Sequence, residues 1–321
     1  MTCDNPLISC VIPAYNEAEN IKKILGDLSA YFISKKIRYE IIIIDDGSVD
    51  NTIEQALQCI DSIPIRLVAL SRNFGKEAAL TAGINIANGD AVILIDADLQ
   101  HPIHVIDDFL SKWGEGYNMV YGVRNSRKDE TWLKRRSADL FYKLMKKMVG
   151  IDIPRNAGDF RLLDKRVVDA IRMLPERTRF MKGMYAWVGY KSTPVMFDVE
   201  ERATGSSSWG FGQLANLAIT GVTAFTDFPL RVAGIVGLLI SLISFLYGMY
   251  IVFDTLLFGS TTPGFATTIV IVTFLGGIQL LSLGVLGEYI AGIFREVKQR
   301  PNYLVDKVYD YDKDSDKDKD D

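Results

Sequence analysis

Short, almost uninterrupted apolar segments alternate with longer amphipathic segments through the first 125 residues of the chain. Strands that are buried on both faces of a sheet have this continuous apolar character, so the apolar segments are predicted to be strands. They cover residues 7–12, 39–44, 65–70, 91–95 and 119–121. The amphipathic segments are predicted to be helices, and they cover residues 18–32, 52–60, 76–87 and 102–113. This alternation predicts an α/β domain with a doubly wound, mostly parallel sheet.

Polar residues follow three of these predicted strands directly. The first strand leads into residues 13–17, the second into 45–50 and the fourth into 96–100. Ligands of doubly wound sheets bind beyond the carboxyl ends of the strands. We therefore expect these three segments to meet at one edge of the sheet and to form the functional site.

Asp96 and Asp98 flank one residue at the end of a strand, so both carboxylates can turn toward one point. Carboxylate oxygens bind Mg²⁺ or Mn²⁺, and such an ion commonly also holds substrate phosphates. We predict a site for Mg²⁺ or Mn²⁺ here. His101 and His104 are close by, but Zn²⁺ would require further His or Cys ligands, so His101 is interpreted as orienting the loop before Pro102.

The segment after the second strand offers a second acidic candidate. Asp46 is predicted to accept hydrogen bonds from a nucleotide base or ribose, and Gly47 permits the tight turn. Ser48 or Asp50 is predicted to cap the helix that follows.

Two long uncharged stretches predict transmembrane helices at about 232–253 and 266–287, since a span needs about 20 apolar residues. A buried helix of a soluble protein is the alternative. Arg231 precedes the first stretch and Arg295 follows the second, whereas the connecting loop carries only Asp254. The positive-inside rule then predicts a multi-pass hairpin in the cytoplasmic membrane, with both termini in the cytosol.

Residues 209–226 carry no charge and space their apolar side chains at helical intervals. They are predicted to form a helix on the membrane surface, or else an ordinary core-facing helix. We expect five regions: a cytosolic α/β domain (1–205), an interfacial helix region (206–229), the transmembrane hairpin (230–293), a cytosolic segment (294–309) and a disordered acidic tail (310–321).

Charge is distributed unevenly along the chain. The formal net charge is −4, and the tail accounts for it with seven Asp against three Lys. Residues 124–182 carry 17 basic and 8 acidic side chains, which suits phosphate binding, although a solvated helix face has the same composition. Cys3, Cys10 and Cys59 lack the spacing of a metal or disulfide framework, which indicates a reducing compartment. No nucleic-acid partner is expected.

Three motifs together resemble the family 2 glycosyltransferases: Val-Ile-Pro-Ala-Tyr-Asn-Glu at 11–17, Ile-Asp-Asp-Gly-Ser-Val-Asp at 44–50 and Asp-Ala-Asp at 96–98. The resemblance implies a nucleotide-diphospho-sugar transferase fold of the GT-A type. It also implies that the nucleotide is surrounded by Pro13, Tyr15, Glu17 and Asp46. The metal would be held by Asp96, Asp98 and Gln100.

Further motifs at 72–76, 158–162 and 225–231, followed by two spans, resemble the polyprenyl-phosphate branch of that family. This branch includes dolichol-phosphate mannosyltransferases and bacterial polyprenyl-phosphate glucosyltransferases, and the resemblance covers about residues 7–300. It implies that Asp159 and Asp98 are catalytic, with Asp159 as a candidate base. The donor would be bound additionally by Lys76, Arg124, Arg127 and Arg136, and the acceptor phosphate by Arg161, Arg202 and Ser206.

Two of these implied roles have alternatives. Asp159 instead orients the acceptor, helps place the metal or forms a buried pair with Arg161. The segment around Arg202 and Ser206 is alternatively a flexible linker, and Ser207 stands where the family often has Lys.

The leading hypothesis is an inverting transfer of a hexose to polyprenyl phosphate, with UDP-glucose and undecaprenyl phosphate favoured. GDP-mannose with dolichyl phosphate, or an amino-sugar donor, is the alternative. A processive polysaccharide synthase would carry a Gln-x-x-Arg-Trp motif, which the sequence lacks. A catalytically silent membrane scaffold or lipid-binding subunit would have no need of the acidic strand ends. Glycines along the two spans permit close helix packing and hence a homo-oligomer.

Overall fold

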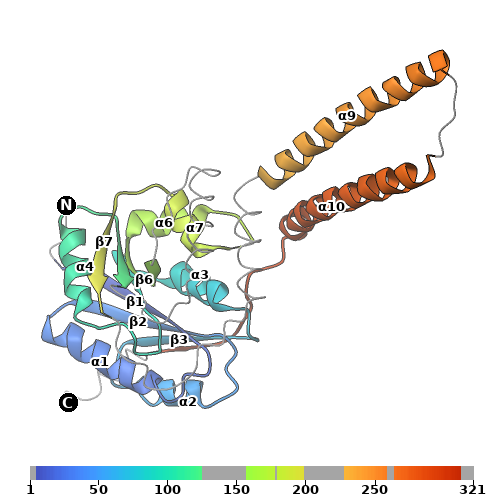
Figure 1. Cartoon of the computed structure of the whole chain (residues 1–321). Coiled ribbons are helices and arrows are strands. Elements are labelled where there is room, and N and C mark those ends of the chain that lie inside the picture. Colours follow the sequence, from blue (N-terminus) through green and yellow to red (C-terminus); the bar gives the residue numbers. More distant parts are fainter. Residues whose placement is uncertain (1–4, 125–156, 178, 199–227, 259–263, 312–321) are drawn as a thin grey trace, which may run out of the picture. The chain divides into compact units, whose positions relative to one another are not determined.

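The computed structural model describes residues 5–124, 157–177, 179–198, 228–258 and 264–311. The chain divides into two compact units (Figure 1). One comprises Met1–Trp209 together with Arg300–Asp321, and the other comprises Gly210–Gln299. The predicted helix at 209–226, the acidic tail from residue 312 and the candidate residues Arg127, Arg136, Arg202 and Ser206 lie outside the described residues.

The first unit contains an eight-stranded mixed sheet with the strand order β7-β5-β6-β4-β1-β2-β3-β8. The central strands β4, β1, β2 and β3 are parallel, as the alternation of apolar and amphipathic segments predicts. The strands are β1 (Leu7–Ala14), β2 (Arg38–Asp45), β3 (Ile65–Leu70), β4 (Ala91–Leu94), β5 (Met119–Arg124), β6 (Ala157–Asp164), β7 (Ser192–Phe197) and β8 (Val305–Asp310).

The five predicted strands correspond to β1–β5, but the sequence reasoning did not anticipate β6, β7 or β8. Strand β6 is antiparallel to both β4 and β5 and lies between them. Its register pairs Leu94 with Arg161 and thereby brings Asp159 near the end of β4. A strand that is inserted between two others leaves no local signal of its partners, which explains why the spatial order could not be read from the chain.

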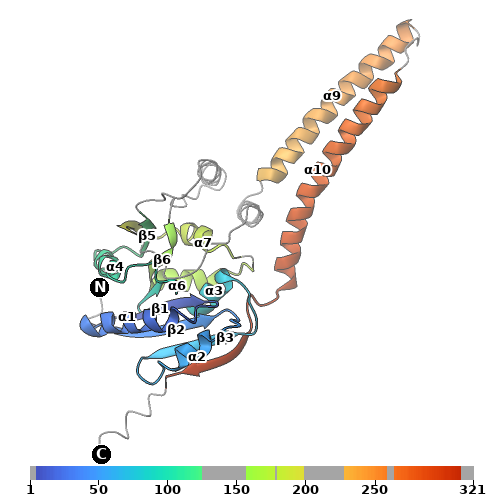
Figure 2. The same ribbon diagram turned by 60° about the horizontal axis from the view of Figure 1, so that its bottom comes forward.

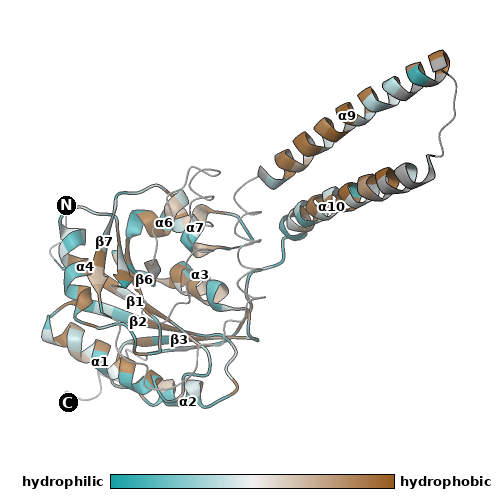
Figure 3. Ribbon diagram, in the orientation of Figure 1, coloured by the Kyte–Doolittle hydropathy of each residue, from teal (hydrophilic) through white to brown (hydrophobic). Residues whose placement is uncertain are grey.

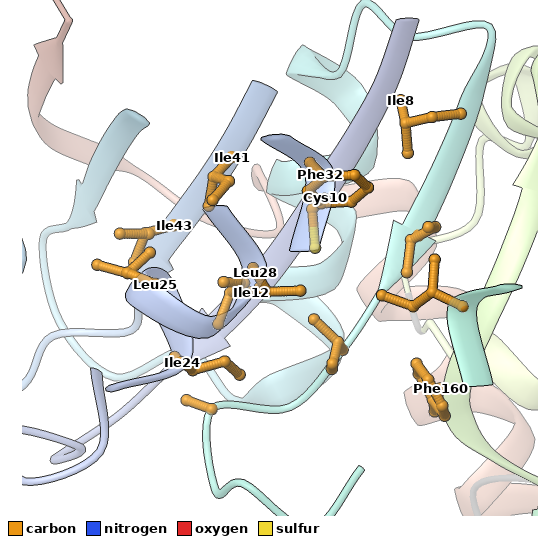
Figure 4. Packing of buried hydrophobic residues seen from close by; sticks show 14 of the residues in the cluster. Ile8, Cys10, Ile12, Ile24, Leu25, Leu28, Phe32, Ile41, Ile43 and Phe160 are labelled. Carbon is orange, nitrogen blue, oxygen red and sulfur yellow. The ribbon is translucent and has the colours of Figure 1, made fainter. Parts of the chain in front are cut away.

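The helices of the first unit cover both faces of the sheet (Figures 1 and 2). They are α1 (Ile21–Ser34), α2 (Thr52–Leu57), α3 (Lys76–Ile86), α4 (Val105–Gly114), α6 (Lys165–Met173) and α7 (Met181–Trp187). Ile8, Cys10 and Ile12 of β1 belong to one buried cluster with Leu28 of α1 (Figure 4). Phe109 of α4 belongs to the same cluster.

Helix α3 packs against the opposite face of the sheet. A Cβ atom at Gly83 would lie 2.2 Å from Cγ1 of Val11 and 3.3 Å from Cγ1 of Ile44. The missing side chain at Gly83 therefore allows α3 to approach β1 and β2 closely. This approach fixes the amino end of α3, and hence Lys76, relative to the strands that lead into the three polar segments.

The second unit contains two long helices, α9 (Phe228–Phe258) and α10 (Phe265–Lys298), which run side by side (Figure 2). Both are apolar over most of their length (Figure 3). Val232–Tyr250 has a mean hydropathy of 2.2 and Phe274–Lys298 one of 1.5, with none of either window buried. At about 1.5 Å per residue each helix is longer than the roughly 30 Å hydrocarbon core of a bilayer. By length and composition, both helices are able to cross a membrane.

After α10 the chain returns to the sheet of the first unit. Strand β8 pairs antiparallel with β3, so that Val68 lies opposite Val308. Arg66 and Asp310 form an ion pair at 2.5 Å, and the Asn85 side-chain amide donates to the Tyr303 hydroxyl at 3.2 Å. Asp310 thus belongs to a strand, although the sequence analysis places it at the start of the acidic tail.

Candidate functional site

The segments that follow β1 and β2 are hydrogen-bonded to each other. The Asn16 N–H donates to Ser48 Oγ at 2.9 Å, and the Val49 N–H donates to Asn16 Oδ1 at 3.0 Å. Asn16 has a φ of 56°, a left-handed conformation that Asn tolerates better than most residues. The Glu17 N–H donates to Thr52 Oγ1 at 2.9 Å. These bonds hold two of the predicted nucleotide-binding segments as one assembly.

The side chains of this assembly differ in their exposure and in their hydrogen-bond partners. Tyr15 is 45% exposed at its edge, whereas Pro13 is half-buried within β1. Asp50 accepts from the Thr52 N–H at 3.1 Å at the start of α2, while Ser48 bonds to Asn16 instead. The N-cap residue of α2 is Asn51, whose side chain forms no capping hydrogen bond, so neither Ser48 nor Asp50 is the N-cap that the sequence predicts; Asp50 instead bonds to the first residue of the helix.

Asp46 connects the end of β2 to the loop before α3. Its two carboxylate oxygens accept the Phe74 N–H at 2.7 Å and the Gly75 N–H at 2.8 Å. Burial raises the pKa of Asp46, and the two N–H donors counteract that rise. Gly47 has a φ of 70°, and a Cβ atom there would lie 2.4 Å from the Arg72 carbonyl carbon. Asp46 and Gly47 thus fix the loop 72–75, and the ligand role of Asp46 stays a prediction.

Asp96, Asp98 and His101 form the acidic centre of the site. One ligand atom from each of them lies within 4.8 Å of the other two. The Gln100 N–H donates to Asp98 Oδ1 at 3.1 Å, and Arg124 Nη2 donates to Gln100 Oε1 at 3.4 Å. Converging carboxylate oxygens with an adjacent amide oxygen suit Mg²⁺ or Mn²⁺. The donor set therefore fits the predicted metal, and Gln100 and Arg124 lie beside it.

The His101 ring is buried against aromatic side chains. It stacks on Phe160 with the ring centroids 4.7 Å apart and meets Phe197 edge-on at 5.7 Å. Its Nδ1 atom has no hydrogen-bond partner among the described residues. Burial lowers the pKa of His101, which favours the neutral imidazole. His101 thus packs the Asp98 loop against β6, in line with its interpretation as a loop-orienting residue, while its ring also lies close to the carboxylates.

Lys76 joins the acidic centre to Asp159. Its Nζ atom lies 2.6 Å from Asp96 Oδ1 and 3.0 Å from Asp159 Oδ2. Burial alone would raise the pKa of Asp159, but the positive charges of Lys76, Lys182 and Arg161 lower it to about 2. For Lys76 the effects have the opposite sign. Burial would lower its pKa, but the negative charges of Asp96 and Asp159 raise it above its usual value. Both groups are therefore ionised at neutral pH.

Arg161 lies beneath this cluster rather than at its surface. The side chain is 4% exposed, and its guanidinium carbon lies 3.7 Å from the centroid of the Tyr185 ring. Its Nη2 donates to the Gly158 carbonyl oxygen at 2.5 Å. Among the described residues it forms no ion pair with Asp159 within 4.0 Å. The position of Arg161 suits support of the 158–161 segment better than direct contact with a lipid phosphate, and its predicted phosphate role remains untested.

Three residues of the cluster were missed by the sequence reasoning: Glu77, Lys182 and Tyr185. Glu77 Oε2 accepts the Met181 N–H at 2.9 Å, which links the first turn of α3 to the start of α7. Burial, followed by the charge of Asp159, raises the pKa of Glu77 to about 7. Glu77 was recognisable only as the neighbour of Lys76, and no local pattern pointed to α7.

A doubly wound sheet with an Asp-x-Asp motif after a central strand is the architecture of GT-A-type nucleotide-diphospho-sugar transferases. The profile of glycosyl transferase family 2 matches residues 9–172, and that of the GtrB C-terminal hairpin matches residues 228–293. The chain belongs to glycosyl transferase family 2.

Relatives match nearly the whole length of the chain. An uncharacterised glycosyltransferase of Synechocystis is 49% identical over 94% of this chain and 95% of that protein. The SfII prophage-derived bactoprenol glucosyl transferase of Shigella flexneri is 45% identical over 94% of this chain and 97% of that protein. A prophage bactoprenol glucosyl transferase homologue of Escherichia coli is 42% identical over 94% and 99%.

Proposed function

We propose that this glycosyltransferase moves a glucosyl group from UDP-glucose to a polyprenyl phosphate at the cytosolic face of a membrane. One observation carries the proposal. Asp96 and Asp98 form a cluster that suits a divalent metal, and Lys76 connects this cluster to Asp159 by forming ion pairs with both Asp96 and Asp159. Relatives named bactoprenol glucosyl transferases, 45% identical over nearly their full length, support the polyprenyl acceptor and the glucosyl group.

The proposed reaction is a single displacement. An oxygen of the acceptor phosphate attacks the anomeric carbon, the bond from that carbon to the diphosphate breaks, and UDP departs with the bonding electrons. Mg²⁺ or Mn²⁺ at Asp96 and Asp98, when bound, neutralises charge that develops on the departing diphosphate. The attack from the opposite face converts an α-linked donor into a β-linked product.

The low pKa of Asp159 argues against a role as general base. With a pKa of about 2 its carboxylate is a weak proton acceptor, and it is already paired with Lys76. A phosphate monoester has a second pKa near 6, so the acceptor is itself largely anionic at pH 7 and can attack without losing a proton to the enzyme. Asp159 is proposed to position Lys76 and the acceptor, as one of the alternatives of the sequence analysis holds.

The return of the chain to the sheet supports the proposed membrane topology. The chain up to Trp209 and the chain from Arg300 onward belong to one folded unit, in which β8 pairs with β3. If both helices cross the bilayer, the two flanks therefore lie on the same side. Arg295 and Lys298 in the last turn of α10 favour the cytosolic side for that end. The donor, a soluble nucleotide sugar, is present in the cytosol.

The test uses membranes that contain the full-length protein, incubated with polyprenyl phosphate and a panel of labelled UDP-glucose, GDP-mannose and UDP-N-acetylglucosamine. The expected result is a glucolipid with a β linkage, formed only with divalent metal. Label transfer from GDP-mannose alone would replace the proposed donor. A product with retained anomeric configuration would overturn the single displacement, and no transfer from any donor would overturn the proposed function.

A further inference from the structure

Lys76 Nζ contacts the same carboxylate group that is expected to bind the metal. The distance to Asp96 Oδ1 is 2.6 Å, and the Lys76 side chain is 43% exposed whereas those of Asp96 and Asp159 are 23% and 16% exposed. An ammonium at this distance satisfies much of the negative charge of Asp96. A metal that enters the site must therefore compete with a cation that belongs to the protein itself.

Electrostatics makes this competition unfavourable for a free metal ion. Mg²⁺ binds a carboxylate oxygen at about 2.1 Å, so a divalent cation and the Lys76 ammonium would repel each other at close range if both stayed on Asp96. A nucleoside diphosphate changes this balance, because its phosphate oxygens offer the ammonium a new anionic partner at the moment the metal arrives.

The structure allows Lys76 to exchange partners. Its ammonium sits on a flexible four-carbon stem with three rotatable donors, and its side chain is partly open to solvent. Its backbone is anchored, because Gly75, the preceding residue, donates its N–H to Asp46. The negative charge of Asp159 would still be compensated without Lys76, because the positive charges of Lys182 and Arg161 also stabilise it and lower its pKa. The head group can thus move while the helix start remains fixed.

We propose that Lys76 is an exchangeable counter-cation that couples metal entry to donor entry. It neutralises Asp96 and Asp159 until a metal-diphosphate arrives, and its ammonium then moves from Asp96 to a phosphate oxygen. The inference rests on the proposed nucleotide-sugar donor. It implies that the free metal binds weakly and that metal and nucleoside diphosphate each strengthen the binding of the other by the same factor.

The test measures Mn²⁺ binding to the purified full-length protein in detergent, by electron paramagnetic resonance of the unbound ion, without nucleotide, with UDP and with GDP. The variants are Lys76→Gln, which removes the charge, and Lys76→Arg, which keeps it. Lys112→Gln is the matched control, since Lys112 of α4 forms an exposed ion pair with Glu115, the residue that follows the helix. Thermal unfolding of each variant establishes that it is folded.

In the absence of UDP, Lys76→Gln is expected to bind Mn²⁺ about tenfold more tightly than wild type, a coupling of ordinary size. UDP is expected to tighten Mn²⁺ binding by at least about tenfold in wild type and by much less in Lys76→Gln. Lys76→Arg and Lys112→Gln should resemble wild type in their affinity for free Mn²⁺.

The proposal is overturned if folded Lys76→Gln binds free Mn²⁺ no more tightly than wild type. If that variant fails to fold, the wild-type protein still tests the proposal. A Mn²⁺ affinity of the wild-type protein that neither UDP nor GDP changes would contradict the coupling. The assay contains neither lipid nor sugar. A failure to transfer glucose, with the Lys76 effect intact, would therefore contradict only the proposed function.

Discussion

The Ser71 N–H donates to the carbonyl oxygen of Leu304 at 2.9 Å, so that a residue beyond the helical hairpin supports the residue before the 72–75 loop. That loop is held on its other side by Asp46. The catalytic sheet is therefore completed by a segment that lies more than 200 residues away from β3 in the sequence. Strand β8 therefore supports the 72–75 loop of the proposed donor site and also forms the edge of the sheet.

Truncation after Pro301 should weaken donor binding. Loss of β8 exposes the edge of β3 and removes the Leu304 acceptor of Ser71, so we expect a lower midpoint of thermal unfolding and a higher KM for the nucleotide sugar. Truncation after Tyr311, which leaves β8 intact, is the matched control. Equal KM values for the two truncated proteins would show that β8 does not support the loop.

Asp46→Asn should loosen the 72–75 loop. The amide of Asn has only one acceptor oxygen, so one of the two backbone N–H groups loses its partner, at a cost of about 1–3 kcal/mol. We expect a lower free energy of unfolding and an increased KM for the donor, measured by denaturant titration and steady-state kinetics. Asp27→Asn on the exposed face of α1 should change neither. Unchanged stability in Asp46→Asn would contradict the anchoring role.

Asp98→Asn should abolish metal-dependent turnover while the fold persists. The amide oxygen can still accept the Gln100 N–H, but it brings no negative charge to a divalent cation. We expect the turnover number to fall by at least about a hundredfold, the order seen when one electrostatic contact to the transition state is removed. Asp61→Asn, at an exposed position, serves as the control. Full turnover in Asp98→Asn would remove the metal assignment.

Glu77 should make the stability of the protein depend on pH. Its pKa rises from 4.5 to about 7 on folding, so between these values the folded state binds more protons than the unfolded state. The free energy of unfolding then falls as pH rises from about 4.5 to 7, by at most about 3 kcal/mol. Thermal unfolding between pH 5 and 8 should show this slope in wild type.

Glu77→Gln should flatten that dependence, because the amide oxygen still accepts the Met181 N–H but does not titrate. Glu54→Gln, on the exposed side of α2, should leave the wild-type slope in place. A wild-type slope that persists in Glu77→Gln would assign the pH dependence to another group.

The pH dependence of turnover should follow the ionisation of the acceptor phosphate and not that of Asp159. Asp159 has a pKa of about 2 and remains ionised throughout the range from pH 5 to 8, whereas the acceptor phosphate loses its second proton near pH 6. We expect activity to rise with pH through about 6 in wild type. The weak residual activity of Asp159→Asn should show the same rise. Disappearance of the rise in Asp159→Asn would restore Asp159 as the general base.

The sequence alone determined the central part of the sheet, the helices between its strands and the two long apolar helices. These features follow from the spacing of apolar residues over short windows, and local spacing is what one chain displays directly. The same reasoning placed Asp46, Asp96 and Asp98 at strand ends, because parallel strands present their carboxyl ends at one edge.

Only the tertiary structure decided that β6 lies between β4 and β5, that β8 forms one edge of the sheet, and that Lys76 bridges Asp96 and Asp159. Each of these depends on pairing between segments far apart in the chain, for which no local periodicity exists. The burial of Arg161 under Tyr185 is of the same kind. A motif can show that an arginine is present, but only packing shows whether its guanidinium group faces a ligand or supports the residues that do.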